Sequence, residues 1–312
     1  MKSPKTRRKH LISRLRLSQL ELLAAMDRTE TLSAAAREVN LTQPAASRLL
    51  RELSCDLHVV LFERIGRALR PTAAGRVLIR KAVGFIADLD RTQQEIEAID
   101  GGLIGTVSVG AGVSSCYVIV PTALKLLMDD SSQIAVSLCE GPMDELLARL
   151  RAGQIDLLVG RFGRDQDMSD IKTQDLYRPS VVAVCGIRHP LVSRRSLQWD
   201  DLYEHPWIFL EAGTAMRSAV EAHFRKQRRR PIRALVESSS IQANVALLTT
   251  SQLIWVLSLD VAKYFAELGA VHILKLEPLP APGAFVLARL NGRVLSPAAQ
   301  KLADCLRTAG RH

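Results

Sequence analysis

The first third of the chain shows apolar residues at helical spacing in three short segments. One apolar face recurs between residues 17 and 24, and a second between residues 32 and 39. Thr31 and Thr42 precede the second and third segments and are candidate N-caps, while Pro44 is tolerated in the first turn of the third helix. Two short helices joined by about three residues form a helix-turn-helix unit. The pattern therefore predicts such a unit within residues 17–57.

The third helix has two contrasting faces. At about 100° per residue, Ala46, Leu50, Leu53 and Leu57 fall in one arc and are expected to face the core. The opposite side carries amide, hydroxyl and guanidinium groups, which read base edges and phosphates, and no acidic residue. An ordinary amphipathic surface helix usually mixes Glu with Lys or Arg. We therefore favour DNA recognition, with these contact residues: Thr42, Gln43, Pro44, Ser47, Arg48 and Arg51.

Two short apolar and basic segments follow this helix. Residues 61–64 and 69–72 flank a glycine-containing turn at residues 65–68, a pattern typical of a β-wing. Arg64 and Arg67 would then lie near a phosphate strand or a minor groove. Thr72 ends the wing and is a candidate cap for the next helix.

A long helix is predicted from about residue 73 to residue 99. Its apolar positions alternate at spacings of four and three, which is the heptad pattern of a helix that packs along another helix. The positions are Leu78, Ala82, Phe85, Leu89, Thr92, Ile96 and Ile99. A helix that pairs with its copy in a dimer is the favoured interpretation, and a helix lying on its own domain is the alternative. Asp100-Gly101-Gly102 ends the helix and forms a hinge.

From residue 103 onward, strand and helix patterns alternate. Repeated βα units predict parallel sheets covered on both faces, and two such series suggest two lobes with a ligand cleft between them. The expected organisation is a basic arm at 1–16, a winged helix-turn-helix at 17–72, a linker helix and hinge at 73–102, and an α/β domain at 103–312. In that domain we expect one lobe at about 103–165 and 270–312, and the other at about 166–269.

Charge supports the division into a head and a body. The net charge is +10, and residues 1–91 hold 18 Lys and Arg against 9 Asp and Glu. A basic head on a nearly neutral body suggests a polyanion-binding domain, although a bias for solubility is an alternative. The sequence contains no run of 18 uncharged apolar residues, so it predicts no transmembrane helix. The five scattered cysteines exclude a disulfide framework and a CxxC zinc site and fit a reducing cytosol, and we expect no metal or cofactor.

Residues 17–99 resemble the DNA-binding head of LysR-type transcriptional regulators. The resemblance rests on four segments in the family's order and spacing: Leu32–Arg37, Leu41–Arg48, Leu61–Arg64 and Leu69–Gly75. The rest of the chain resembles that family's effector domain, which is similar to periplasmic solute-binding proteins. Gly153–Leu157 and His189–Leu191 match segments of that domain. The head departs from the family in having His58 where a glycine, and Val60 where a proline, is usual.

The resemblance implies a homodimer formed through the linker helix, often assembled into a tetramer. Such a protein binds double-stranded promoter DNA and switches transcription when a small metabolite, here a sugar, a sugar acid or an aromatic acid, binds between the lobes. By position, Ser114 and Ser115 would offer donors to the ligand, and Arg161 would pair a carboxylate. Pro142 and Met143 would line the cleft, and Thr214 and Ser238 would contribute from the second lobe.

Two other functions compete with this interpretation. A nucleotide-dependent enzyme is suggested by Gly110-Ala111-Gly112 after a strand and Asp129 about 20 residues later, but Ser115 stands where the third glycine is required. No nucleophile elbow, HExxH or Walker loop is present, so we expect no enzymatic activity. A sequence-blind architectural DNA binder would need no two-lobed body. Cys116 is either an oxidation sensor or an inert buried thiol, and Arg225–Arg230 either touches DNA or is a solvated helix end.

Overall fold

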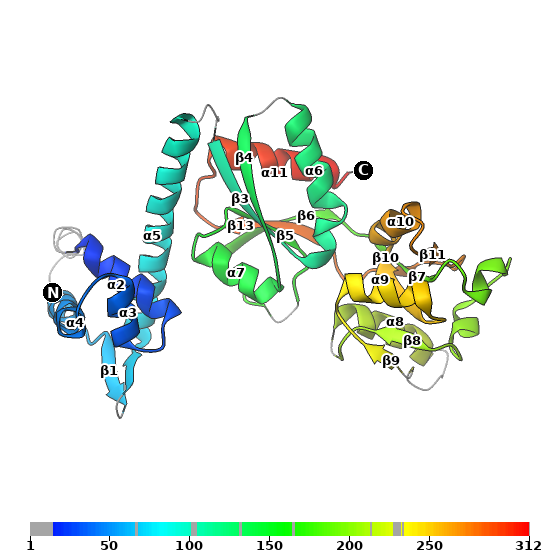
Figure 1. The fold of residues 1–312 in the computed structure, drawn as a ribbon, viewed down its shortest axis with the longest axis horizontal. Coiled ribbons are helices and arrows are strands. Elements are labelled where there is room, and N and C mark those ends of the chain that lie inside the picture. The colour runs from blue at the N-terminus through cyan, green and yellow to red at the C-terminus, as the bar shows by residue number, and fades with distance from the viewer. Residues whose placement is uncertain are drawn as a thin grey trace. The chain divides into compact units, whose positions relative to one another are not determined.

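The computed structural model describes residues 15–65, 68–100, 105–130, 133–163, 166–212, 214–226, 232 and 234–311 (Figure 1). The chain divides into two compact units. The head unit comprises Met1–Thr106 together with Ala148–Ile155, and the body unit comprises Val107–Leu147 and Asp156–His312. The predicted basic arm up to residue 14, the wing residue Arg67 and most of the arginine run after Lys226 lie outside the described residues.

The head unit is a winged helix-turn-helix, as predicted. Its elements are α2 (Leu17–Arg28), α3 (Leu32–Glu38), α4 (Gln43–Leu57), β1 (Phe62–Ile65), β2 (Ala68–Pro71) and α5 (Ala73–Asp100). Both expected N-caps are confirmed, because the Thr31 hydroxyl accepts from the Ala34 amide at 3.2 Å and the Thr42 hydroxyl from the Ala45 amide at 3.4 Å. The strands β1 and β2 pair in antiparallel fashion, which forms the wing.

The predicted apolar stripe of α4 lies in the core of the head. Ala46, Leu50 and Leu53 are buried against Leu22 and Leu23 of α2, and Leu57 packs at the edge of this cluster. The first half of α5 adds Ile79, Ala82 and Val83 to the same core. Leu17, which was expected on the buried face of α2, is 49% exposed.

Thr72 and Gly75 fix the start of α5 against the wing. The Thr72 hydroxyl donates to the Val60 carbonyl at 2.8 Å and accepts from the Gly75 amide at 3.1 Å. A Cβ atom at Gly75 would collide with the Leu61 carbonyl oxygen, so no larger residue fits there without a backbone shift. The Thr72 side chain and the close approach at Gly75 therefore hold the start of the linker helix against the segment that precedes the wing.

The body unit contains two sheets (Figure 1). The first has the order β4-β3-β5-β13-β6, with β3 at Gly105–Ala111, β4 at Ile134–Glu140, β5 at Leu157–Gly160, β6 at Ile171–Tyr177 and β13 at Phe285–Leu290. The second has the order β11-β7-β10-β8-β9, with β12 also paired to β7. Its strands are β7 (Ser180–Cys185), β8 (Trp207–Phe209), β9 (Ala234–Glu237), β10 (Ile254–Ser258), β11 (His272–Ile273) and β12 (Leu279–Pro280).

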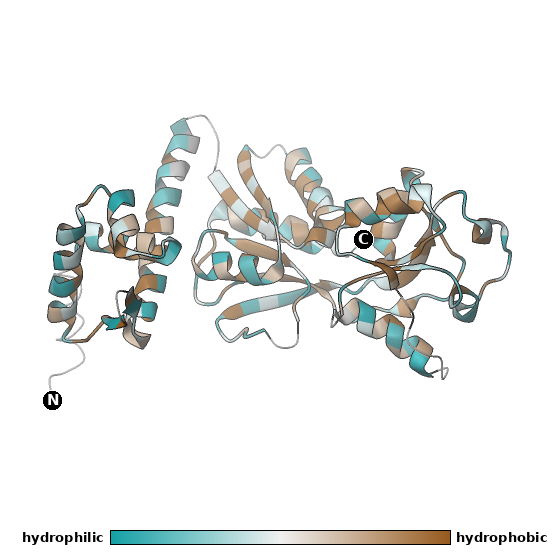
Figure 2. Ribbon diagram, turned by 60° about the horizontal axis from the view of Figure 1, so that its bottom comes forward, coloured by the Kyte–Doolittle hydropathy of each residue, from teal (hydrophilic) through white to brown (hydrophobic). Residues whose placement is uncertain are grey.

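Helices cover both sheets. The first sheet, with α6 (Ile119–Asp129), α7 (Met143–Arg151) and α11 (Pro297–Ala309), forms the first lobe, and the second sheet, with α8 (Ala215–Lys226), α9 (Ile241–Thr250) and α10 (Leu259–Glu267), forms the second lobe. Short 3₁₀ segments lie at Val113–Cys116 (η1), Pro190–Ser193 (η2) and Trp199–Leu202 (η3). Figure 2 shows hydrophobic residues concentrated along the strands of both sheets, where the cores lie.

Three expectations for the body are corrected. The sheets are mixed, not parallel, because β13 runs antiparallel to β5 and β6, and β7 antiparallel to β10. The chain crosses between the lobes at residues 178–179 and 281–284, not near 166 and 270, because β6 pairs in the first sheet and β11 and β12 in the second. The sequence missed β6, whose exposed middle is polar, and α10, which follows β10 directly.

The buried His189 ring is held by backbone groups on both of its nitrogens. Its Nδ1 accepts from the Leu191 amide at 3.1 Å, and its Nε2 lies 3.2 Å from the Gln252 carbonyl oxygen. Burial lowers the pKa of His189, the Gln252 carbonyl opposes that shift and His205 adds to it, so the neutral ring is favoured.

No described helix is long and apolar enough to cross a membrane.

The turn after α4 forms despite the missing glycine and proline. His58 adopts the left-handed conformation, with φ 54° and ψ 36°, and its amide donates to Cys55 at 3.2 Å. The Val59 amide donates to the Ser54 carbonyl at 3.2 Å, so the last carbonyls of α4 are paired. A residue with a Cβ atom in this conformation is strained, and glycine is not.

We therefore expect His58→Gly to stabilise the head by about 1 kcal/mol, because it removes this strain. The melting midpoint of the head, followed by calorimetry, should rise by about 4–8 °C. The control is His58→Ala, which keeps a Cβ atom at the same φ and should give no increase. A midpoint that falls in His58→Gly would show that side-chain contacts of His58 outweigh its backbone strain.

Candidate nucleic-acid interface and ligand site

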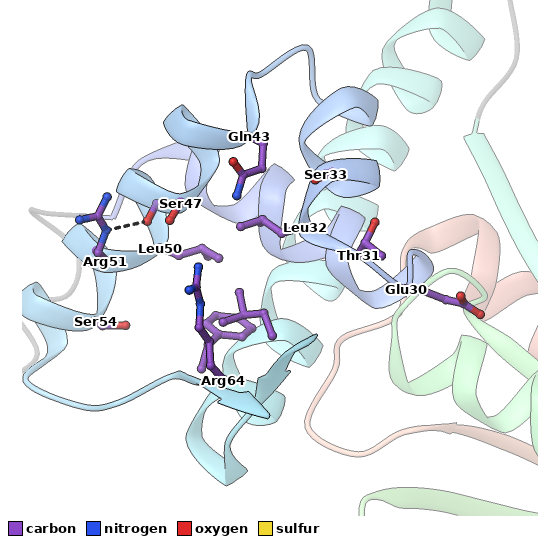
Figure 3. A pocket seen from close by; sticks show the side chains of 12 residues that line it. Glu30, Thr31, Leu32, Ser33, Gln43, Ser47, Leu50, Arg51, Ser54 and Arg64 are labelled. Atoms are coloured by element: carbon purple, nitrogen blue, oxygen red, sulfur yellow. Dashed lines mark hydrogen bonds between the residues drawn. The ribbon is translucent and has the colours of Figure 1, made fainter. Parts of the chain in front are cut away.

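A groove of about 840 Å³ lies between α4 and the wing. Polar side chains of α4 and Arg64 of β1 line it above an apolar floor of Leu32, Leu50, Phe62 and Leu69. Figure 3 shows Arg64 extending from β1 into this space, with Gln43 and Ser47 on the side of α4. Gln43, Ser47, Arg51 and Arg64 were all predicted to contact DNA, and the structure brings these four together.

The remaining predicted contacts lie beside the groove. Thr42, Pro44 and Arg48 are exposed but do not line it. Arg48 lies 4.0 Å from Glu52, an exposed pair of little energetic consequence that leaves the guanidinium available. Arg51 donates only a long bond, 3.4 Å, to the Ser47 carbonyl, so most of its N–H groups point to solvent.

The groove also contains residues that sequence reasoning missed. Glu30, Ser33 and Ser54 line it, from the turn before α3, the first turn of α3 and the last turn of α4. The exposed Glu30 carboxylate adds a negative charge to the groove. Ser33 lies within the family-like segment Leu32–Arg37, and that was the available signal.

The exposed surface of α5 continues the predicted heptad pattern. Ala82 is buried and Leu78 half-buried on the head's own core, whereas Phe85, Leu89 and Ile96 are 49%, 42% and 58% exposed. The two interpretations of this helix therefore apply to different parts of it. Its first half lies on its own domain, and its second half presents apolar side chains without a described partner.

In the body, three predicted ligand residues meet at the carboxyl edge of the first sheet. Ser114 lies in η1 after β3, Met143 begins α7 after β4, and Arg161 directly follows β5. A Cβ atom at Gly112 would lie 2.9 Å from the Met143 sulfur, and one at Gly160 would collide with it, so the three strand ends are closely packed. Pro142 is exposed beside them.

Ser114 and Ser115 differ in their environments. Ser115 is fully buried, and its hydroxyl donates to the Val159 carbonyl at 3.3 Å, which ties η1 to β5. Ser114 is half-buried and lies between Val113 and Tyr117, which both pack against the core of the second lobe. Of the two hydroxyls, that of Ser114 is therefore the one free to meet a ligand.

Arg161 occupies an unusual environment for an arginine. Its guanidinium carbon lies 4.8 Å from the centroid of the Phe285 ring, and among the described residues its Nη1 has no hydrogen-bond partner. The Nη1 atom is buried. Burial lowers the pKa of Arg161, while Asp260 and Tyr177 oppose that shift. A desolvated cation without a hydrogen-bond acceptor is a natural site for an anionic group.

Thr214 and Ser238 lie together at the carboxyl edge of the second sheet. The Thr214 hydroxyl donates to the Glu211 carbonyl at 2.9 Å, and the Ser238 hydroxyl accepts from the Ser240 amide at 3.2 Å. Arg217 of α8 joins the two loops, because its Nη1 donates to the Leu210 carbonyl at 2.9 Å and to Glu237 at 2.8 Å. Both predicted hydroxyls thus have local partners but stay partly accessible.

Several buried polar residues of the body were missed from the sequence. Asn244 of α9 is fully buried and donates to the Ser238 carbonyl at 3.3 Å, but its Oδ1 has no partner among the described residues. Tyr117 and Asp260 also carry buried oxygens without a described partner. A polar residue within the apolar segment Ile241–Leu248 was the signal for Asn244, whereas Asp260 was hidden because α10 itself was missed.

A separate hollow of about 660 Å³ lies in the body unit. Tyr117, Tyr177, Asp260, Lys263 and Tyr264 are among the residues that line it. None of the seven predicted ligand residues lines this hollow. It therefore adjoins the lobe junction without being the predicted cleft.

The sequence left two interpretations of Cys116 open. Burial, followed by Glu140, raises the pKa of the Cys116 thiol to about 12, which favours the inert interpretation over an oxidation sensor. Within the described residues, no group of three or more His, Cys, Asp or Glu side chains is placed to hold a metal ion.

Comparisons with known proteins agree with this architecture. Residues 17–76 match the bacterial regulatory helix-turn-helix protein, lysR family, and residues 100–311 match the LysR substrate binding domain. The transcriptional regulator GbpR of Azospirillum brasilense is 31% identical over 96% of this chain and 88% of its own length. The transcriptional activator CmpR of a Synechocystis strain is 28% identical over 93% of this chain and 94% of its own.

Solved structures show the same fold. Full-length CbnR in complex with its target DNA gives a TM-score of 0.64 at 20% identity, covering 95% of this chain and all of the other. ArgP from Mycobacterium tuberculosis gives 0.64 at 18% identity, covering 94% and 96%. On the matched domains and the relatives, this chain belongs to the LysR family of transcriptional regulators and is a DNA-binding regulator, not an enzyme.

Proposed function

We propose that this regulator reads promoter DNA with α4 and the wing, pairs with its copy through α5, and changes its transcriptional output when an anionic metabolite binds at the junction of the body's lobes. The groove between α4 and the wing supports the first part. Gln43 and Ser47 supply hydrogen-bonding groups for base edges, and Arg51 and Arg64 supply two cations for bases or phosphates.

The exposed half of α5 supports pairing with a second copy. Full burial of one large apolar side chain is worth about 1.5–3 kcal/mol, and Phe85, Leu89 and Ile96 repeat on one face of the helix. A two-fold pair also presents two reading helices, which doubles the DNA contacts of one protomer.

The observation that carries the effector proposal is the buried Nη1 atom of Arg161, which has no hydrogen-bond partner among the described residues. Its neighbours at the sheet edge, Ser114 and Met143, offer a hydroxyl and an apolar surface. A carboxylate of a sugar acid or an aromatic acid would supply the missing acceptor. Thr214 and Ser238 would add contacts from the second lobe, since a ligand that shifts a lobe equilibrium must bind the two arrangements with different affinities.

Arg51→Ala tests the reading of DNA. Loss of the guanidinium should weaken binding to a promoter fragment by about 1–3 kcal/mol if it contacts a base, with thermal stability nearly unchanged. Fluorescence anisotropy with fragments selected from the protein's own genome measures this change. Arg149→Ala on α7 removes the same charge from an exposed site and should leave affinity unchanged. Equal affinity of Arg51→Ala and wild type at low and moderate salt would contradict the assignment.

Leu89→Glu tests pairing through α5. A carboxylate on each partner at an apolar contact costs desolvation and repulsion, so the dimer should dissociate about 100-fold more readily, and affinity for a two-site promoter should fall with it. Analytical ultracentrifugation measures the first effect. Ala87→Glu adds the same charge on the side of the helix opposite Leu89, at about 100° per residue, and should preserve the dimer. If Leu89→Glu dimerises normally, α5 does not carry the contact.

Arg161→Met tests the effector site. A thermal-shift screen of full-length protein with gluconate, galacturonate, benzoate and 4-hydroxybenzoate should find a stabilising carboxylate. Arg161→Met should lower affinity for it at least about tenfold, the effect of losing one charge-assisted hydrogen bond, and leave the unliganded protein as stable as wild type or more so. Arg178→Met, an exposed neighbour, should bind normally. Unchanged affinity in Arg161→Met would remove Arg161 from the site.

A further inference from the structure

The junction between the lobes contains two groups of opposite charge that are both incompletely paired. Arg161 follows β5 of the first lobe, and Asp260 lies in the first turn of α10 in the second lobe. Among the described residues, Arg161 Nη1 and Asp260 Oδ1 are both buried without a hydrogen-bond partner. Each unsatisfied buried group destabilises the arrangement that contains it.

Asp260 has one partner, and that partner is a phenol. Its Oδ2 accepts from the Tyr177 hydroxyl at 2.5 Å, a bond between the end of β6 and α10. Burial and the neighbouring Asp260 raise the pKa of Tyr177, so its hydroxyl stays protonated and donates. This single hydrogen bond thus joins the two lobes at the place where the chain first crosses between them.

Arg161 reaches the same place from the other side. Its guanidinium lies over the Phe285 ring, and Phe285 stacks on Tyr177 with centroids 4.9 Å apart and an interplanar angle of 16°. We call Arg161, Tyr177, Asp260 and Phe285 the junction cluster. Phe285 and Tyr177 are register partners at the ends of β13 and β6, so the first crossing leaves the first lobe at this cluster and the second crossing returns to it here.

We propose that Asp260 exchanges partners: it bonds Tyr177 in the arrangement described here and forms an ion pair with Arg161 in a second arrangement of the lobes. The exchange gives a partner to both Arg161 Nη1 and Asp260 Oδ1, the two atoms that lack one in the arrangement described here. Because β5 and α10 belong to different lobes, it requires a displacement of one lobe against the other. The junction cluster is therefore a two-state element within the body.

The exchange explains how a ligand would control the lobes. This step rests on the proposed function, in which an anionic effector binds Arg161. A carboxylate bound there occupies the guanidinium and leaves Asp260 to Tyr177, so the ligand favours the arrangement described here. Without the ligand, Asp260 and Arg161 attract each other, and the second arrangement gains population.

The test uses full-length protein without any ligand. A double-mutant cycle of Arg161→Met and Asp260→Asn is measured by urea unfolding, followed by tryptophan fluorescence, and then repeated in a Tyr177→Phe background. Trp199, Trp207 and Trp255 all lie in the second lobe, so the signal reports on this domain. The amide introduced by Asp260→Asn still accepts from Tyr177 but cannot form an ion pair with Arg161, so the cycle isolates that pair.

The expected coupling between Arg161 and Asp260 is about tenfold in the unfolding equilibrium constant. Tyr177→Phe removes the competing donor and should enlarge that coupling about threefold or more. A static cluster predicts that Tyr177→Phe leaves the coupling unchanged or reduces it, and this result would overturn the exchange. A coupling near unity in both backgrounds would overturn it as well.

The exposed pair Asp175 and Arg178 provides the matched control. These side chains lie 3.5 Å apart on the same strand end, with 65% and 70% of their surfaces exposed. The cycle of Asp175→Asn and Arg178→Met should give a coupling below about threefold in both backgrounds. Since the junction cycle contains no ligand, its failure refutes the exchange alone, whereas unchanged carboxylate affinity in Arg161→Met refutes the effector site alone.

Discussion

The apolar stripe of α4 is the constraint on which the reading surface depends. Ala46, Leu50 and Leu53 are buried against α2 and the start of α5, and this burial fixes the rotation of α4 about its axis. Once the rotation is fixed, Gln43, Ser47 and Arg51 must face the groove. Thr72 and Gly75 hold β1 and α5 against the same core, so Arg64 reaches the groove from the opposite wall.

The head and the body place their functional groups by different means. In the head, the core directly sets the outward face of one helix. In the body, the candidate ligand residues lie at the ends of different strands, and the Arg161 guanidinium lies over an aromatic ring with the charge of Asp260 nearby. A stacked guanidinium is oriented but not neutralised, which keeps its charge available for a ligand.

The parts of the structure that the sequence predicts well are those governed by local periodicity. The caps Thr31 and Thr42, the buried arc of α4 and the two-stranded wing follow from spacing alone, and all are confirmed. The heptad pattern of α5 also continues on its exposed surface, but periodicity cannot show which half packs on its own domain. That division depends on how far the tertiary contacts with α2 extend along α5.

The body is predicted less completely because its key residues are joined by long-range pairing. β6 carries a polar, exposed middle and is a strand only because β13 pairs with it, so the crossing after Tyr177 was misplaced. Tyr177 and Asp260 are 83 positions apart in sequence and meet in space through that crossing. Likewise, Ser115 was expected to face a ligand, but η1 turns its hydroxyl back to Val159.

The distribution of unsatisfied polar atoms connects stability with regulation. A protein that only had to be stable would replace a buried, unpaired Arg161 by an apolar side chain of similar size. Polar atoms without described partners at Tyr117, Arg161 and Asp260 instead lie near the chain crossings between the lobes, and those of Asn244 and Trp255 lie within the second lobe. A junction that is incompletely satisfied in one arrangement lowers the free-energy difference to another, and a small difference is what a metabolite of ordinary affinity can overcome. The well-packed α4 core and the incompletely paired lobe junction thus suit opposite requirements, a fixed reading face and a movable sensor.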